Sequence, residues 1–345
     1  MEPEPASDEG PPLNSGREFL PSTVKAADAG AALVGFLLAH WPHDDEAHWE
    51  AKVRAGCVAI DGAACADPGA TLALNSRVVY TRPPWREPPV PSRWGVAFED
   101  GDVVVLDKPE GMPVMPSETF FEGTVMRRLA RLYPKESLPA PAHRLGRGTS
   151  GCLLCARTPA ARRGVGKQFQ EGSVGKLYLA EVAGSPDAWP EGRLTVTAPI
   201  GMVAYDEGWV SATGGVRSGV TKSGGGGGKA GRSGATGIWA ASESGKPSVS
   251  HLRFVRATAK GSLLEVRIET GRPHQIRIHA AFVGFPLVGD PLYAKGGVPK
   301  PRASDGTLAL ATDCGYRLHC WRLTWRHPST GEQLVTEAPP PAWAS

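Results

Sequence analysis

The sequence predicts an α+β protein made of two units. Its 345 residues exceed the length that a single hydrophobic core usually serves. Apolar segments with the alternation of strands are interspersed with segments of helical period along the chain. A proline-rich segment at 83–96 separates the first group of such segments from the second, and consecutive prolines are typical of a stiff linker.

The first unit is expected at 21–82, after a polar tail at 1–20 whose Pro, Glu and Ser content predicts disorder. Its pattern is two helical segments, then a short hairpin and a later strand, which together make a small α+β module. These elements are expected at 32–41, 47–55, 58–62 and 78–80.

The second unit is expected at 97–345, interrupted by a flexible Gly- and Ser-rich insertion at about 206–247. Thr158 and Pro159 are a typical helix start, as N-cap and first helical residue. Apolar runs and alternation predict strands near 103–106, 151–156, 176–184, 250–268 and 318–326, and helical spacing predicts helices at 121–132, from 158, and before Gly284.

Composition narrows the function classes. The formal net charge is +3, and the first ten residues hold four acids and no base, so the rest is more basic and weakly favours a polyanionic partner. The apolar stretch 30–41 is too short to span a membrane, and the acidic N-terminus resembles no signal or transit peptide. We therefore expect an intracellular protein that does not enter membranes, with the compartment open.

Cysteine usage predicts neither a disulfide framework nor a metal site. Six cysteines are few for this length. Cys152 and Cys155 form a C-x-x-C, but they fall in an apolar strand where an offset of three places them on opposite faces. We expect buried core cysteines and no metal.

Clusters of polar residues each lie next to an apolar strand, as in a cleft assembled over a sheet. They hold Arg, Lys, His, Gln and Tyr, with few carboxylates and no metal-ligand set. Such an inventory suits phosphate groups and a flat aromatic ring. The clusters are Lys108 to Gly111, His143 to Gly151, Lys176 with Tyr178, and Arg272 to His279.

Five segments in order resemble the motif set of the RluA-type RNA pseudouridine synthases, and they cover about 97–345. They are "KPEGMPV", "HRLGRGTSGCLLCART", "KLYLAEV", "GRPHQIRIHAAFVGFPLVGDPLY" and "LHCWRLTWRHP". The segment "VRAGCVAIDG" resembles more loosely the small α-L RNA-binding domain that many of these enzymes carry. The resemblance implies an α+β catalytic domain with a mixed sheet and a central cleft, and isomerisation of uridine to pseudouridine without a cofactor. It also implies RNA as the partner, either tRNA or rRNA, and we expect a monomer.

The resemblance also implies roles for single residues. Tyr178 matches the family tyrosine that packs on the uracil, and Arg277 matches the arginine that pairs with the catalytic aspartate. That aspartate occupies the fourth position of the H-R-L-D-R motif, which here is Gly146. Contacts to RNA are expected from Lys108, His143, Arg144, Arg147, Arg272, His274 and Gln275.

Glycine at 146 leaves the reaction without its carboxylate, because glycine has no side chain to act as nucleophile or base. A carboxylate could come instead from Asp290, Asp107 or Glu118, although acids at such places often cap turns or helices. We expect Gly146→Asp to create or raise activity if the remaining site is competent.

Three functions stay open at this point. The first is a pseudouridine synthase that works without the usual aspartate or with another acid. The second is a catalytically inactive RNA-binding protein on the same fold, a chaperone or assembly factor. The third is a sugar- or nucleotide-binding protein unrelated to RNA, which the N-terminal module argues against.

Overall fold

The computed structural model describes residues 13–19, 21–41, 44–184, 189, 192–204, 237–301, 307, 309–310 and 312–345. They form two compact units, the first made of residues up to 89 together with 117–122, and the second made of 90–116 and 123–345. Most of the expected tail and of the expected insertion lies outside the described residues. No helix within the described ranges combines the length and the apolar character needed to cross a membrane.

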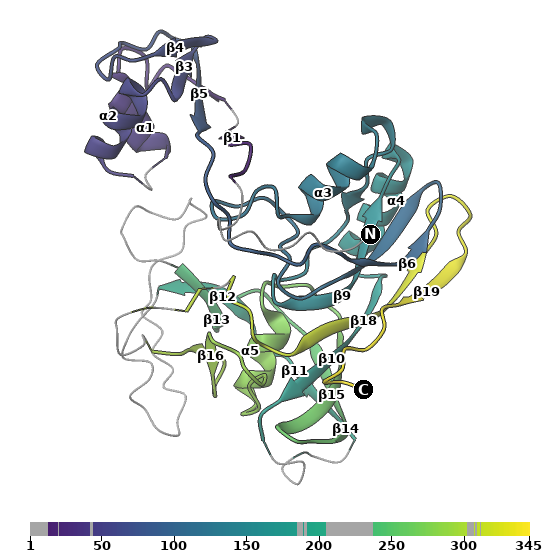
Figure 1. Ribbon diagram of the computed structural model, residues 1–345. Helices are drawn as coiled ribbons and strands as arrows, with labels where there is room; N and C mark the ends of the chain where they lie inside the picture. Colours follow the sequence, from purple (N-terminus) through teal and green to yellow (C-terminus); the bar gives the residue numbers. More distant parts are fainter. Residues whose placement is uncertain are drawn as a thin grey trace. The chain divides into compact units, whose positions relative to one another are not determined.

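The small unit is an antiparallel sheet with helices (Figure 1). Its core is a cluster of buried apolar side chains that includes Trp49 and Tyr80. Strand β5 pairs with β1, β2 and β3, and β3 pairs with β4. The elements are β1 (Arg17–Glu18), β2 (Ser22–Thr23), α1 (Leu33–His40), α2 (Glu46–Arg54), β3 (Val58–Ile60), β4 (Ala63–Cys65) and β5 (Arg77–Arg82).

Two expectations about disorder are partly wrong. Arg17–Glu18 forms β1, because its backbone pairs with the free edge of β5 and Phe19 stacks on Tyr80 with ring centroids 5.4 Å apart. Within the expected insertion, Gly237–Ala241 forms β13, which pairs with β12 (Ile200–Ala204). Composition predicts disorder from the local chain, and pairing partners far away in sequence override it.

Within the described part of the chain, ten strands form the large sheet of the second unit, in the order β11-β14-β15-β10-β18-β9-β7-β6, with β19 on β18 and β8 on β9. The sheet is mixed, since β18 pairs with β9 in parallel but with β10 and β19 in antiparallel orientation. Its strands are β6 (Gly95–Glu99), β7 (Val103–Lys108), β8 (Ala140–Pro141), β9 (Thr149–Ala156), β10 (Gly175–Val182), β11 (Arg193–Val196), β14 (Ser250–Thr258), β15 (Gly261–Ile268), β18 (Leu318–Arg326) and β19 (Gln333–Glu337).

Helices α3 (Val125–Leu132), α4 (Pro159–Glu171) and α5 (Gln275–Phe282) contribute side chains to the core of this sheet. A short 3-10 helix covers Lys135–Ser137, and the strands β16 (Tyr293–Ala294) and β17 (Val298–Pro299) form a separate pair. Helix α4 begins as expected, with the Thr158 hydroxyl accepting from the Ala161 amide at 3.1 Å, and ends at Gly172 with φ of 71°.

Helix α5 is buried on more than one side. Ile276 and Ala280 belong to the core of the large sheet, whereas Ile278 and Ala281 belong to a second cluster with Ile200 of β12 and residues of the 292–293 segment. A helix enclosed in this way holds its polar residues in the interior. Arg277, between those two sets, is therefore fixed in place by its neighbours.

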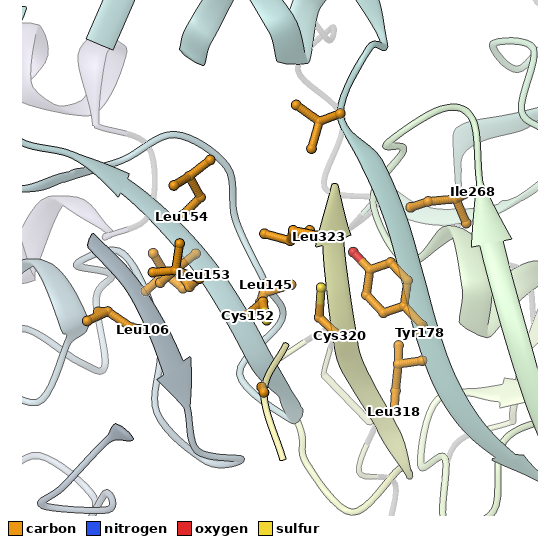
Figure 2. Packing of buried hydrophobic residues seen from close by; sticks show 14 of the residues in the cluster. Leu106, Leu145, Cys152, Leu153, Leu154, Tyr178, Ile268, Leu318, Cys320 and Leu323 are labelled. Atoms are coloured by element: carbon orange, nitrogen blue, oxygen red, sulfur yellow. The ribbon is translucent and has the colours of Figure 1, made fainter. Parts of the chain in front are cut away.

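The motif strand β9 lies in the interior of the large sheet, and Figure 2 shows its leucines and Cys152 packed in the core. Cys152 and Cys155 are buried free thiols, and burial raises the pKa of both. Gly151 has φ of 103°, and a Cβ there would lie 2.2 Å from the Cys320 carbonyl oxygen. Only glycine permits β9 and β18 to approach this closely.

We expect Gly151→Ala to destabilise the second unit by at least about 3 kcal/mol, because the added methyl overlaps the β18 backbone and the φ value disfavours it. Gly166→Ala is the matched control. Its Cβ meets nothing within 4 Å in α4, so it should stabilise by about 0.5–1 kcal/mol. Urea unfolding followed by tryptophan fluorescence measures both, and equal midpoints for the two variants would contradict this account.

Candidate active site

Lys108 connects two of the motif loops from inside the protein. Its ammonium donates to the carbonyl oxygens of Pro109 and Met112, both at 2.8 Å, and of Arg147 at 3.3 Å. The residue is 0% exposed, and burial lowers its pKa to about 7. Lys108, expected to contact RNA, instead fixes the loop at 108–112 against the loop that contains Gly146.

Arg147 strengthens the same connection. Its Nε donates to the Gly111 carbonyl at 3.1 Å, while the Gly111 amide donates to the Arg147 carbonyl at 2.8 Å. Arg144, three residues earlier, is exposed. Of these two arginines, Arg144 is the one whose position suits a contact with a large partner.

His143 is a half-buried part of the scaffold. Its Nε2 accepts from the Leu154 amide at 3.1 Å, and its ring stacks on Phe169 with centroids 4.8 Å apart. Burial, followed by the charge of Lys176, lowers the pKa of His143 to about 3. The ring is therefore neutral and orients the motif loop.

Arg277 and Asp290 form a buried ion pair, with side chains 2% and 1% exposed. Nε and Nη2 of Arg277 each donate to a different oxygen of Asp290 at 2.8 Å. The Arg277 guanidinium carbon also lies 4.1 Å from the ring centroid of Tyr316 and 5.1 Å from that of Tyr293. Burial alone would lower the pKa of Arg277, but the hydrogen bonds and charge of Asp290 raise it.

Asp290 is thus the carboxylate that reaches Arg277, and it has further partners. Its Oδ1 also accepts from the amides of Leu292 at 2.8 Å and Tyr293 at 3.1 Å. Within the described residues Oδ1 accepts three hydrogen bonds and Oδ2 accepts one. Asp290 therefore holds both Arg277 and the turn at Leu292 and Tyr293.

The other two candidate carboxylates lie elsewhere. Asp107 is on β7 opposite Gly95. Burial raises the pKa of Asp107, and the positive charge of Lys108 lowers it by a smaller amount. Glu118 is exposed and belongs to the first unit.

A hollow of about 490 Å³ beside the Asp290 turn has Pro291, Lys300 and Leu310 in its lining.

Gly146 is exposed, and the space next to its Cα is occupied by Tyr316. A Cβ at Gly146 would lie 2.6 Å from the Tyr316 hydroxyl oxygen and 3.3 Å from Oγ1 of Thr149. A Cβ at Gly148 would lie 2.8 Å from Cε1 of the same ring. Tyr316 is 2% exposed, so it has little room to move. The expectation that Gly146→Asp alone raises activity is therefore opposed by the packing, since the new side chain would collide with the phenol.

Tyr178 lies on β10 with its ring in the main core (Figure 2). It pairs across the sheet with Val266 and Cys320. Burial is the main cause that raises its pKa well above the ordinary value. Tyr178 is a neutral phenol at any physiological pH.

The segment before α5 is held by its own side chains. The Gln275 amide donates to the Val249 carbonyl and Ser250 Oγ, both at 2.9 Å, and its oxygen accepts from Thr270 and Arg272. His274 has φ of 55° and is bonded to the Tyr293 hydroxyl at 2.8 Å. Burial lowers the pKa of His274 to about 4. Both residues, expected to contact RNA, shape the loop, whereas the partly exposed Arg272 bonds the Pro247 carbonyl at 3.2 Å.

A family model described as RNA pseudouridylate synthase matches residues 102–282, which is more than half of the chain. The chain belongs to the RNA pseudouridylate synthase family. An RNA pseudouridine synthase 5 of Oryza sativa subsp. japonica is 33% identical over 96% of this chain and 88% of its own length. An uncharacterized RNA pseudouridine synthase of Synechocystis is 35% identical over 90% of this chain and 94% of its own length.

The fold agrees with this family. The structure of human RNA Pseudouridylate Synthase Domain Containing 1 superposes with a TM-score of 0.50 at 24% identity, covering 74% of this chain and 86% of that one. The α+β fold with a large mixed sheet, predicted from the sequence, is confirmed.

Within this pseudouridine synthase fold, sequence reasoning missed Tyr316. It precedes β18 in a segment without periodicity or a motif, so no local pattern marks it. The one available signal is the spacing of glycines at 146 and 148, which leaves room for a large side chain but does not say which one.

We expect Asp290→Asn to destabilise this pseudouridine synthase by about 3–5 kcal/mol, because it leaves the Arg277 charge buried without an anion. Asparagine keeps an oxygen for the Leu292 and Tyr293 amides, so the loss reports the charge. Glu265→Gln breaks a pair with Arg253 whose side chains are 48% and 22% exposed, and should cost less than about 1 kcal/mol. Thermal and urea unfolding measure both, and similar losses would argue against a buried charge at Arg277.

Stability should also fall in acid. Between pH 6.5 and about 3, the unfolded chain binds a proton at His143 that the folded chain does not, so the free energy of unfolding decreases as pH falls through this range. His274 adds to this loss down to about pH 4.

His143→Gln keeps an acceptor for the Leu154 amide but has no ionisable ring. We expect its urea midpoint to decrease less steeply with falling pH than that of the unsubstituted protein. Identical slopes would show that His143 is protonated in the folded state.

Proposed function

We propose that the protein isomerises uridine to pseudouridine in structured RNA through a variant of the family site that has no carboxylate at position 146. The reaction breaks the bond from N1 of uracil to C1′ of ribose and joins C5 to C1′. No atoms are gained or lost, so the chemistry requires no co-substrate. The family membership supports the reaction class.

The observation that carries the proposal is the fixed, positively charged side chain of Arg277 near Gly146. Arg277 is oriented by two hydrogen bonds to Asp290 and by the rings of Tyr293 and Tyr316. A guanidinium held in this way in a low-dielectric interior can stabilise negative charge that develops during the reaction. Lys108 and Arg147 fix the loop that brings Gly146 to the same place.

We further propose that residues 97–345 perform the chemistry and that the module at 21–82 helps to bind RNA, with the protein acting as an intracellular monomer. Either tRNA or rRNA suits this arrangement. A protein named ribosomal large subunit pseudouridine synthase D in Nitrosomonas europaea is 31% identical over 71% of this chain and 62% of its own length, which supports rRNA. Arg144 and Arg272 are the side chains that we assign to phosphate contacts, because Arg147 bonds the Gly111 carbonyl.

A second candidate function is RNA binding without catalysis, as a chaperone or assembly factor. The absent carboxylate at 146 and the engagement of Asp290 with Arg277 and the turn favour it. The two functions differ in product. Purified full-length protein is incubated with tRNA and rRNA transcripts, and pseudouridine is mapped by carbodiimide adducts that stop reverse transcription. New pseudouridine supports the enzyme, whereas RNA binding with no product on any transcript supports the second function.

We expect Arg144→Ala to weaken RNA binding and to make the plot of log affinity against log salt shallower by about 0.7–0.9 for each lost phosphate contact. Arg193→Ala, which removes an exposed arginine from β11, is the matched control and should change neither quantity. Filter binding or fluorescence anisotropy at several salt concentrations measures both. An unchanged salt slope for Arg144→Ala would remove this residue from the interface.

A further inference from the structure

The Tyr316 hydroxyl occupies the place of the missing carboxylate. Its oxygen lies 2.6 Å from the Cβ position of Gly146, and a carboxyl carbon would follow one bond of about 1.5 Å beyond that Cβ. The phenol oxygen therefore lies within the space that an aspartate at 146 would need. The phenol is a proton donor at the same place as the missing carboxylate, and it comes from the segment that precedes β18.

The motif loop is built to receive this ring. Cβ atoms at Gly146 and at Gly148 would both overlap Tyr316, so the two glycines together form the space that it fills. The hydroxyl is also within 3.2 Å of Thr149 Oγ1, which orients it. A buried tyrosine hydroxyl usually has such a partner, and here the partner belongs to the motif loop itself.

The electrostatic setting suits proton transfer. Burial raises the pKa of Tyr316, so the phenol keeps its proton at neutral pH, while the nearby Arg277 charge acts in the opposite direction. The hydrogen bond with Thr149 also lowers this pKa, whereas the charge of Asp290 raises it. The Arg277 guanidinium, 4.1 Å from the ring centroid, can stabilise a phenolate that forms transiently.

We propose that Tyr316 is a catalytic acid and base of this enzyme and takes over the position of the family aspartate. This inference rests on the proposed function. As the N1–C1′ bond breaks, its electron pair stays on N1 of the uracil, and the Tyr316 hydroxyl proton passes to that nitrogen. The base turns, the C5=C6 electrons form the C5–C1′ bond, and the proton released from C5 returns to the Tyr316 oxygen. Atoms and charge balance, and the enzyme returns to its starting state.

The test uses the full chain and an RNA that it modifies. Tyr316→Phe keeps the ring over Arg277 and removes one oxygen. We expect the single-turnover rate to fall about 10²–10⁴-fold, as for loss of an acid-base group, with RNA affinity unchanged within about twofold. Tyr133→Phe is the matched control, because it removes a hydroxyl that is bonded to Glu99 at 3.0 Å on a half-buried tyrosine outside the motif loops, and it should keep the full rate.

Full single-turnover activity of Tyr316→Phe would overturn the role of Tyr316 while leaving the proposed function intact. If the unsubstituted chain makes no pseudouridine on any RNA, the proposed function and this inference both fail. Fluorotyrosine at 316 separates chemistry from positioning, since fluorine lowers the phenol pKa with little change of size. A rate and a pH profile that follow the phenol pKa support acid-base catalysis, whereas insensitivity to it contradicts the proposal.

A pair of variants tests the shared position directly. Gly146→Asp alone should lose stability and stay poorly active, because its Cβ meets the Tyr316 oxygen. Combined with Tyr316→Phe, the nearest ring carbon, Cζ, is 3.9 Å from that Cβ, so the clash with the ring is removed and Thr149 Oγ1 at 3.3 Å is the nearest remaining atom. We expect the double variant to regain activity above Tyr316→Phe. A Gly146→Asp single variant as stable and active as the double would contradict a common position for phenol and carboxylate.

Discussion

The ion pair between Arg277 and Asp290 is the constraint on which the rest of the site depends. A guanidinium with 2% exposure needs an anion, and Asp290 supplies both of its oxygens to it. The same carboxylate caps the turn that begins the 292–293 segment, whose side chains pack on α5. Removing this charge would leave α5 and the segment without their common anchor. The arginine thus organises the fold around the site before it takes any part in chemistry.

Much of the fold could be predicted because its signals are local. The start of α4 at Thr158 and Pro159 and its end at Gly172 follow from caps and backbone preference. The strands of the second unit follow from apolar runs. The ordering of residues 13–19 could not be predicted in this way, because β1 exists only through its pairing with β5, some sixty residues later. The central place of β18 is equally a property of the whole sheet.

The site shows the same division. Motif spacing identified Arg277 and the position of the absent acid, and turn chemistry made Asp290 a candidate. The sequence could not show that Asp290 pairs with Arg277 and also caps a turn, because this pairing depends on where the turn meets α5. The resemblance placed Lys108, His143 and Gln275 in contact with RNA, but Lys108 and Gln275 are buried, His143 is half-buried, and each has a partner inside the protein. Tyr316 lies outside every sequence motif, and the glycines at 146 and 148 indicate only that some large side chain fills the space beside them.

The position of β18 has a consequence for how the protein is made. This strand is close to the C-terminus, yet it lies between β10 and β9 in the middle of the sheet. During synthesis β9 and β10 are made first, and the edges that they offer to β18 stay unpaired until about 140 more residues have been added. Pairing between segments so far apart in sequence is slow. The segment that carries Tyr316 arrives with β18. A chain cut short before residue 316 would therefore lack both the central strand and the group facing Gly146, so the site cannot assemble until β18 has been synthesised.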